Sequence, residues 1–512
     1  MKVDIIGGGV GGLCAGIVLQ QRGVQTTIYE AQPRAGGLCT NWRRGKYSFN
    51  GCIHWVLGLS AGSSFSDMWR HVFGSEAGNL LDQMRCLNFD ERVSIEIPKG
   101  EADDAEGSTW TFTMLNDPDR FEAYLLSLAP EDKRVIKKWM DAVRMVAHML
   151  PDLPPYPTER SLWGRMWHRI KLCRLWPMLP FMLQWGKRTT ASFAKEFKNE
   201  RLSRAIERLY MEPTGMVVVI MGQAYMAKGV APYPIGGSEA LTAALTLRYA
   251  QLGGTLRLAS PVERIVAQEV KGRCRATGLV LTDGTTTEAD WVCSAADWRW
   301  TMGKALGLEF LSDGQRALVD CPDDMIYPSY CRLHLGLAQD LRHLPHYMRV
   351  CCSVDLPDGT HQDQLEIEVN HFDPTLAPEG HTTVTINYVT RNGRWWHERY
   401  VGERAAYNEA KARVWDMTRE VLQQKLGNQL DLSAVEVVDI ATPVTYWRYT
   451  GNTLGSSQGW APQRNMLRRL PTGPTIKGVG NFVMVGHWQE AGGGIPVALI
   501  SAIRAERIIC GG

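Results

Sequence analysis

The sequence predicts an α/β fold in which a discontinuous Rossmann-like domain is joined to an α+β domain. Three observations carry this prediction. A strand–turn–helix–strand unit with a glycine fingerprint spans residues 3–30, a second Gly-rich island spans 233–300, and a buried strand followed by a Gly-rich helix start spans 481–509. At 512 residues the chain is too long for one simple core, so two closely joined domains are expected.

The first unit has the spacing of a dinucleotide-binding turn. The apolar run Val3–Ile6 leads into Gly7, Gly9 and Gly12, and an apolar helix follows. In such a turn the first glycine allows the tight bend, the second admits a pyrophosphate and the third lets helix and strand pack closely. Free N–H groups and the positive dipole end of the helix then face the phosphates. The predicted contacts are Gly7, Gly9, Val10, Gly11 and Gly12.

Glu30 is predicted to bind the ribose of this dinucleotide. It ends the next strand-like run, Gln25–Tyr29, and lies 18 residues after Gly12. A carboxylate at that distance from the fingerprint accepts hydrogen bonds from a ribose 2′-OH. Strand, helix, acid and spacing therefore agree on a dinucleotide site.

The segment after Glu30 indicates which dinucleotide is bound. A second glycine pair follows, and Asn50-Gly51 comes after a short polar loop. These residues resemble the segment that runs along the FAD ribityl chain and ring in flavoproteins of the two-dinucleotide-binding-domain type. The whole block is similar to the phytoene dehydrogenase, carotenoid isomerase and retinol saturase superfamily. The resemblance implies FAD, with contacts from Ala31, Gly36, Gly37, Leu38 and Gly51.

The C-terminal region adds to this resemblance. Asn481–Gly486 reads as a buried strand, and three glycines precede an apolar helix that runs to Ile509. Such a helix start leaves its N–H groups open and favours the negative charge of a reduced flavin. The superfamily carries a similar Gly-rich segment, from which this chain departs at Ala491 and Val497. The residues implied to border the cofactor are Gly486, Glu490, Gly493, Gly494 and Ile495.

The mid-chain island resembles the second flavin-domain segment of the superfamily. Tyr233–Leu241 precedes an Ala/Leu-rich helix, Gly278–Gly284 reads as a hairpin and Asp290–Asp297 as a final strand. In the superfamily a Pro-x-Val backbone stretch meets the adenine, and the resemblance gives this role to Val262. Thr442–Thr445, with Tyr449 and Gly455, resembles the run that leads into the last segment.

The positions of these motifs predict the domain organisation. The FAD-binding domain takes residues 1–75, 233–304 and 441–512, and the substrate domain takes 76–232 and 305–440. Alternating polar and apolar residues predict strands at 93–97, 109–113, 365–369 and 382–389. Long helices are predicted from Asp119 to Met149 and from Glu403 to Leu426.

Composition excludes several classes of protein. A hydrophobic fraction of 45% and a charged fraction of 21% are those of a folded globular protein. The net charge of +2 implies no general attraction to nucleic acid. The 12 cysteines form no C-x-x-C pair, and no metal site is predicted. Without a secretory signal or a spanning apolar run, we expect a cytoplasmic protein with reduced thiols.

The stretch from Ser161 to Lys195 stands apart. It contains four tryptophans, and all its charges are basic: Arg165, Arg169, Lys171, Arg174, Lys187, Arg188 and Lys195. This pattern suits a segment that dips into anionic lipid headgroups and makes the protein peripherally membrane-associated. The alternative is a lid helix packed on the core. Either role places an apolar opening nearby and favours a lipophilic small-molecule substrate.

No residue is assigned a catalytic role from the sequence. His54 is either a proton donor or acceptor near the flavin ring or a structural histidine, and Glu490 either touches the ribityl chain or substrate or is solvated. His487 stands where flavin hydroxylases and disulfide reductases have Asp, which tells against those classes. No cluster of charged residues suited to a polar substrate is expected. A second fingerprint for NAD(P)H is absent, so NAD(P)H would bind only as a transient reductant.

Three functions remain compatible with the sequence. The resemblance implies an FAD-dependent oxidoreductase that desaturates, saturates or isomerises a polyene or isoprenoid chain at flavin N5. The first alternative is a tailoring enzyme that reductively cyclises a polyene, as in polycyclic tetramate macrolactam pathways, with NADPH as reductant. An amine oxidase or a non-enzymatic prenyl carrier is the remaining alternative. The oligomeric state is left open.

Overall fold

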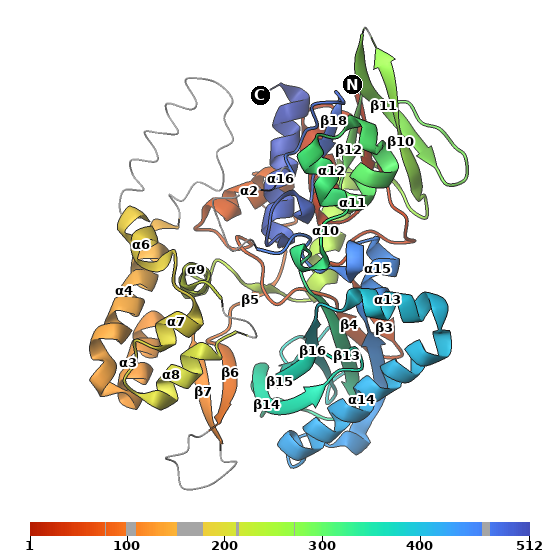
Figure 1. The fold of residues 1–512 in the computed structure, drawn as a ribbon. Helices are drawn as coiled ribbons and strands as arrows, with labels where there is room; N and C mark the ends of the chain where they lie inside the picture. The colour runs from red at the N-terminus through yellow and green to blue at the C-terminus, as the bar shows by residue number, and fades with distance from the viewer. Residues whose placement is uncertain are drawn as a thin grey trace.

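The computed structural model describes residues 1–76, 78–98, 109–150, 178–210, 214–270, 272–462, 470 and 472–511. Two sheets organise this part of the chain. Figure 1 shows a five-stranded sheet with its helices in the upper half and a seven-stranded sheet in the lower half. A group of helices, from α3 to α9, lies to one side of both. The Rossmann-like α/β fold with a second α+β part is therefore confirmed.

The five-stranded sheet is parallel and has the order β18-β12-β1-β2-β9. Its strands come from stretches far apart in sequence. They are β1 (Lys2–Ile6), β2 (Gln25–Tyr29), β9 (Thr255–Arg257), β12 (Trp291–Ser294) and β18 (Phe482–Met484). The strands follow the three segments that the glycine motifs mark, and the proposed limits of the two domains are compatible with this sheet.

Both faces of this sheet are buried. Side chains alternate between the faces of a strand, so Val3 and Ile5 of β1 contact one core and Ile6 contacts another. The first core lies under α1 (Val10–Gln21), α10 (Gly237–Gln251) and α16 (Gly494–Cys510), and α1 packs against both of the others. The second core includes the hairpin of β10 (Val262–Val270) and β11 (Arg273–Leu281). Helices and a hairpin thus cover the parallel strands on both sides, as such sheets require.

The seven-stranded sheet has the order β17-β13-β16-β15-β14-β6-β7, and only β14 and β6 pair in parallel. Its strands are β6 (Glu91–Pro98), β7 (Thr109–Leu115), β13 (Ser329–Leu337), β14 (Tyr347–Asp355), β15 (His361–Val369), β16 (Thr382–Thr390) and β17 (Val435–Ala441). The long helix α14 (Arg404–Leu426) shares a hydrophobic core with one face of this sheet. The four predicted strands and the second predicted long helix are present.

Two elements differ from the sequence prediction. The helix predicted from Asp119 to Met149 is two helices, α3 (Pro118–Leu128) and α4 (Lys133–Met149). Proline at 130 disfavours a helical conformation at Ala129 and cannot donate a helical hydrogen bond, so the chain turns there. In the region 278–284, the Gly284 turn is present and Val280 bridges to Thr286, but the main partner of β11 is β10.

The helical group has its own core. It combines α3 and α4 with α6 (Met178–Trp185), α7 (Thr190–Ala194), α8 (Glu200–Glu207) and α9 (Met216–Ala227). Of the Trp-rich stretch 161–195, residues 161–177 lie outside the described part of the chain. Trp185 is buried and packs edge-on against Phe193. No helix among the described residues is long and apolar enough to cross a membrane.

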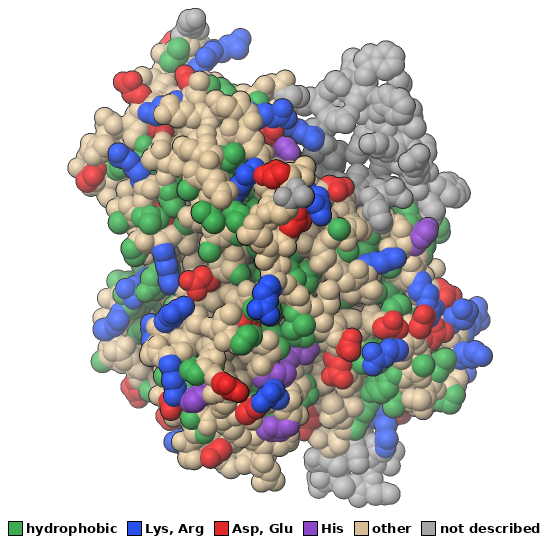
Figure 2. Space-filling model, turned by 180° about the vertical axis from the view of Figure 1, so that it is seen from behind, with side chains coloured by type: hydrophobic (Ala, Val, Ile, Leu, Met, Phe, Trp, Pro, Cys, Tyr) green, Lys and Arg blue, Asp and Glu red, His purple; other side chains and the backbone are tan. Residues whose placement is uncertain are grey.

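The visible surface carries no block of charge of a single sign. On the face shown in Figure 2, Lys and Arg side chains are interspersed with Asp and Glu. Within the described residues, no group of three or more His, Cys, Asp or Glu side chains has the geometry of a metal site.

Candidate active site

The predicted phosphate-binding turn connects β1 to α1. Gly7 has φ +93°, which L side chains rarely adopt, and a Cβ on Gly12 would lie 2.0 Å from the Gly7 carbonyl oxygen. Gly9 caps α1 without any side-chain hydrogen bond, so Val10, Gly11 and Gly12 form an open first turn. A Cβ on Gly9 would meet only the Gly36 carbonyl oxygen within 4 Å, at 3.9 Å. The turn therefore has space beside Gly9 for an anionic ligand.

Glu30 points back at this turn from the end of β2. Its carboxylate is buried and accepts hydrogen bonds from the N–H of Gly8 at 2.7 Å and of Gln32 at 2.9 Å. Burial raises the pKa of the Glu30 carboxyl, and these two backbone donors oppose the rise. Ala31 follows at an exposed position. Glu30 is thus held beside the fingerprint, and its role at the ribose stays a prediction.

The second glycine pair lies against the first motif. The N–H of Gly36 donates to the carbonyl of Gly8 at 2.8 Å, and Gly9 and Gly36 form a parallel bridge. Gly36 and Gly37 have φ values of +127° and +61°. A Cβ on Gly51 would lie 2.2 Å from the carbonyl oxygen of Thr40 and 3.1 Å from that of Leu38. The structure therefore brings the second pair, Leu38 and Gly51 into one cradle next to Gly9.

The C-terminal glycines bring a second helix start to the same place. Gly486 has φ +94°, and a Cβ on Gly11 would lie 2.8 Å from its Cα. Gly493 has φ +34°, and a Cβ there would lie 1.9 Å from the Gln458 carbonyl oxygen. Gly493 caps α16 without a side-chain hydrogen bond, and the half-buried Ile495 lies in the first turn. The α1 and α16 starts are therefore linked through the close approach of Gly11 and Gly486.

Two further predicted contacts occupy defined positions. Val262 pairs with Leu281 at the start of β10, and the N–H of Ser260 donates to the Glu30 carbonyl at 2.8 Å. The mid-chain segment therefore lies directly against Glu30, the residue predicted to bind the ribose. The Glu490 carboxylate forms an ion pair with Arg504 at 3.3 Å and is half-buried.

The cradle fits a flavin dinucleotide on grounds independent of the motifs. Both polar atoms of the buried Gln489 amide and Nε2 of His487 lack hydrogen-bond partners among the described residues. Buried polar atoms without partners are costly and point to a missing ligand or water. Burial lowers the pKa of His487 to about 4, so its ring is neutral and can accept or donate a hydrogen bond. Together with two helix starts without side-chain caps, these atoms suit the polar edge of a bound flavin.

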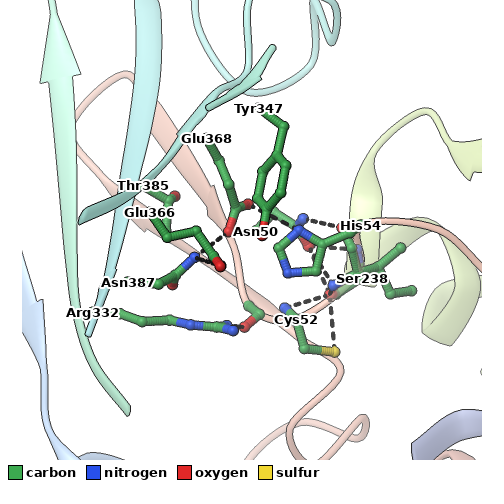
Figure 3. Close-up of polar contacts among 12 residues, drawn as sticks. Asn50, Cys52, His54, Ser238, Arg332, Tyr347, Glu366, Glu368, Thr385 and Asn387 are labelled. Atoms are coloured by element: carbon green, nitrogen blue, oxygen red, sulfur yellow. Dashed lines mark hydrogen bonds and ion pairs between the residues drawn. The ribbon is translucent and has the colours of Figure 1, made fainter. Parts of the chain in front are cut away.

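The face of the seven-stranded sheet that is turned away from α14 is polar. Cys331, Leu333 and Leu335 of β13 face the core shared with α14, so Arg332 and His334 face the other side. The neighbouring strands repeat the pattern, which places Glu366 and Glu368 of β15 and Thr385 and Asn387 of β16 on that same side. Figure 3 shows several of these side chains directed at the loop that follows Gly51. The expectation that no charged cluster exists is wrong.

Three of these side chains, Glu366, Glu368 and Asn387, form a connected network with His54. Nδ1 of His54 lies 3.3 Å from the Glu368 carboxylate, and the Asn387 amide donates to both Glu368 and Glu366. Glu366 also lies 3.4 Å from Arg349. Burial raises the pKa of Glu368, but His54 and Arg332 outweigh this and bring it to about 2. Burial lowers the pKa of His54, yet the Glu368 carboxylate raises it above its ordinary value overall.

The loop that carries His54 is anchored at the start of α10. The Asn50 Oδ1 accepts hydrogen bonds from the Ser238 hydroxyl at 2.7 Å and the Ser238 N–H at 3.1 Å. The Ser238 Oγ in turn accepts from the N–H of Cys52 at 3.1 Å and of Ile53 at 3.2 Å. This arrangement fixes His54, whose side chain is 36% exposed, between the cofactor cradle and the polar face. His54 is therefore anchored through an ion pair and remains accessible.

Family comparison agrees with this geometry. Residues 5–72 match the NAD(P)-binding Rossmann-like domain, and residues 205–509 match the flavin containing amine oxidoreductase family. The chain belongs to the flavin containing amine oxidoreductase family. The second match alone covers more than half of the sequence, and it makes the protein a flavin-dependent oxidoreductase. The resemblance to phytoene dehydrogenase-like proteins is confirmed by similar curated proteins.

Two curated proteins and one solved structure are similar to this chain. A prolycopene isomerase of an Oncidium hybrid is 24% identical over 495 residues, which cover 92% of this chain and 76% of the relative. A zeta-carotene-forming phytoene desaturase of Myxococcus xanthus is 24% identical over 99% of this chain and 94% of its own. A putrescine oxidase structure has a TM-score of 0.59 at 13% identity, covers 100% of this chain and 99% of its own, and shares the fold.

The sequence reasoning missed Arg332, Glu366, Glu368 and Asn387. Glu366 and Glu368 alternate with apolar residues, a pattern that usually marks a solvated face of a strand. One signal was available, because the three strand-like segments 331–337, 365–369 and 382–389 carry polar residues at every second position. Three such segments in a region assigned to substrate would have pointed to a shared polar face.

Proposed function

We propose that this flavin-dependent oxidoreductase changes the double bonds of a lipophilic polyene or isoprenoid substrate by desaturation, saturation or isomerisation. The observation that carries the proposal is the near full-length similarity to the carotenoid isomerase and desaturase, over 92% and 99% of the chain. The fold similarity to putrescine oxidase does not extend to substrate, because identity there is 13%.

The arrangement of the site is compatible with this chemistry. When bound, FAD supplies a two-electron acceptor or donor at its ring. The residues of this chain hold the dinucleotide through Glu30 and the two open helix starts. The polar face of the seven-stranded sheet contacts the loop that follows the cradle, through Arg332 at Gly51 and Glu368 at His54. His54, whose pKa is raised by Glu368 and whose side chain is 36% exposed, can hold or release a proton.

The test is an anaerobic reaction of the FAD-loaded protein with polyenes of different saturation, delivered in detergent or vesicles. Desaturation should bleach the flavin band and shift the polyene absorption to longer wavelength, because conjugation lengthens. Saturation by reduced enzyme should give the opposite shift. Isomerisation should change the polyene spectrum without net flavin reduction. Rapid bleaching by putrescine, with no response to any polyene, would overturn the proposal in favour of amine oxidation.

The source of electrons decides between the two polyene chemistries. Reductive cyclisation of a polyene requires an external reductant, and NADPH is the reductant in that alternative. Anaerobic mixing of the FAD-loaded protein with NADPH should leave the flavin band unchanged if the substrate itself reduces the flavin. Bleaching within seconds would favour the saturating or cyclising reaction, with NADPH bound transiently because no second fingerprint is present.

We also propose that a surface on α6 delivers the substrate from a membrane. Phe181 and Trp185 of α6 are buried, while Leu179, Met182 and Leu183 on the opposite side are 53%, 40% and 78% exposed. Exposed apolar side chains at i, i+3 and i+4 form one stripe on a helix, and such a stripe suits the surface of a bilayer. We call Leu179, Met182 and Leu183 the α6 stripe. Contact with anionic lipid through residues 161–195 stays a proposal.

A further inference from the structure

Arg332 is a buried cation without a carboxylate partner among the described residues. It lies in the middle of β13 and is 8% exposed. Its Nη1 donates to the carbonyl of Gly51, its guanidinium lies 4.7 Å from the centre of the Tyr330 ring, and its Nε has no partner. Figure 3 shows the side chain extending from the sheet toward the Gly51–Cys52 loop. A buried guanidinium in this state is costly, because it has lost water and its nearest acidic neighbour, Glu368, acts on it only from beyond ion-pairing distance.

The other charges of the polar face are already paired. Glu366 lies at ion-pairing distance from Arg349, and Glu368 is shared by His54 and Asn387. Each of these two carboxylates thus has a nitrogen partner within 4 Å. Arg332 is the cation of this face for which the described residues place no carboxylate within that distance.

Neutral hydrogen-bonding groups surround this cation. The Tyr446 hydroxyl is buried without a partner, and burial raises its pKa to about 12 although the Arg332 charge opposes the rise. Burial lowers the pKa of His334 to about 3, and its Nε2 also lacks a partner. A neutral phenol donates a hydrogen bond to an oxygen anion, and a planar guanidinium binds a carboxylate through two N–H groups. Tyr446 and His334 thus offer neutral hydrogen-bonding groups near Arg332, and the Glu368 carboxylate is already engaged by His54 and Asn387.

We propose that the substrate carries a carboxylate, which binds Arg332 with help from the Tyr446 hydroxyl. This inference rests on the proposed function and narrows it, from an apolar hydrocarbon to a lipophilic acid. The carboxylate would supply the hydrogen-bond acceptor that the Arg332 Nε and the Tyr446 hydroxyl lack. Because Arg332 also contacts Gly51 of the cofactor cradle, the acid end would fix which carbons of the chain lie at the flavin. Arg332 and Tyr446 are then specificity-determining residues.

The test is equilibrium binding of benzoate and benzamide to the FAD-loaded protein, followed through the flavin spectrum and the thermal midpoint. The two probes share a ring and differ in charge. We expect wild type to bind benzoate at least about tenfold more tightly, as a charge-assisted pair allows. Arg332→Met should remove this preference and the benzoate-dependent rise in midpoint. Arg342→Met, at an exposed arginine that pairs with Asp340, removes the same charge elsewhere and should leave both intact.

Two milder variants keep the test decisive if Arg332→Met takes up no FAD. Arg332→Lys should retain part of the benzoate preference, because the charge remains and the two-pronged geometry is lost. Tyr446→Phe should weaken benzoate about ten- to a hundredfold, the loss of one hydrogen bond to a charged group, and leave benzamide unchanged. Equal affinity for both probes in wild type, or a preference that survives both Arg332 variants, overturns the proposal.

A second probe pair separates this inference from the proposed function. All-trans-retinoic acid and its methyl ester share a polyene chain and differ in the carboxylate. Tighter binding of the acid, dependent on Arg332, supports both. Arg332-dependent benzoate binding without binding of either polyene keeps the carboxylate site and overturns the polyene function. Equal turnover of acid and ester keeps the polyene function and overturns the carboxylate site.

Discussion

At the scale of single residues, the two carboxylates of the site show what sequence can reveal. Glu30 was predictable because its role depends on local spacing within one β–α–β unit. Glu368 was not, because its partners His54, Arg332 and Asn387 come from other elements. Strand register decides which side chains meet, and no pattern within a single strand contains that information.

The first prediction concerns Glu30. Glu30→Ala should weaken FAD binding by about 1.5–3 kcal/mol, the contribution of hydrogen bonds to a charged group. Fluorescence titration of the apoprotein with FAD measures this change. Glu30→Gln should lose less, because the amide oxygen still accepts one hydrogen bond. Asp283→Ala, at an exposed turn, is the control. Unchanged affinity in Glu30→Ala would show that the carboxylate serves only the Gly8 and Gln32 N–H groups.

The second prediction concerns the Glu368–His54 pair. The folded pKa of Glu368, about 2, lies below its ordinary value of 4.5, so the pair stabilises the protein above pH 4.5. That stability is lost as pH falls toward 2. Between pH 6 and 3 the free energy of unfolding of Glu368→Gln should therefore fall less than that of wild type. The pKa of His54 is raised by Glu368, and NMR titration should find it lower in Glu368→Gln. An unchanged His54 titration would contradict the pairing.

At the scale of secondary structure elements, the places where helices start shape the cofactor site more than the lengths of the helices do. Both open starts were predictable, because glycine before an apolar run is a local signal. Pro130 marks the break between α3 and α4, but the strong helical periodicity on either side predicts one continuous helix. The polar face of the seven-stranded sheet depends on the pairing of β13 with β16 and of β16 with β15, and the β13–β16 pairs join residues 45 to 61 positions apart.

The third prediction separates the two glycines of the α1 start. Gly9→Glu should fold, because a Cβ there meets only one atom within 4 Å, yet it should abolish FAD binding by placing a carboxylate against the pyrophosphate. Gly12→Ala should lose stability as well, because its Cβ would lie 2.0 Å from the Gly7 carbonyl oxygen. Circular dichroism and bound-flavin absorbance measure both effects. Gly402→Glu, at a site with open space, is the control. A Gly9→Glu protein that purifies with stoichiometric FAD would contradict the site.

At the scale of the whole molecule, the order of the motifs along the chain was enough to expect one discontinuous domain. The five-stranded sheet draws strands from both ends and the middle, in agreement with that expectation. The relation of the two sheets was beyond sequence reasoning. It depends on many weak contacts between segments that carry no motif.

The fourth prediction tests the α6 stripe. Changing Leu179, Met182 and Leu183 together to Ser should weaken binding to anionic phosphatidylglycerol vesicles at least about tenfold, because each buried apolar side chain contributes roughly 1 kcal/mol or more. FAD content should not change. The matched control changes three other exposed residues, Leu247, Leu308 and Val401, to Ser. Vesicle sedimentation measures both triples. If the two triple variants retain vesicle binding equally, a lid role for this region is favoured.

The joining of the first and last helices has a consequence for how the protein matures in the cell. The buried Glu506 of α16 binds Arg22 at 2.6 Å and His71 at 2.7 Å, across sequence separations of 484 and 435 residues. During synthesis the N-terminal fingerprint must therefore wait, with the face of α1 that packs on α16 uncovered, until α16 has left the ribosome. Long-range closure of this kind is slow and exposes nascent chains to aggregation. Chaperone supply and translation speed, rather than FAD concentration, should then limit the yield of active enzyme.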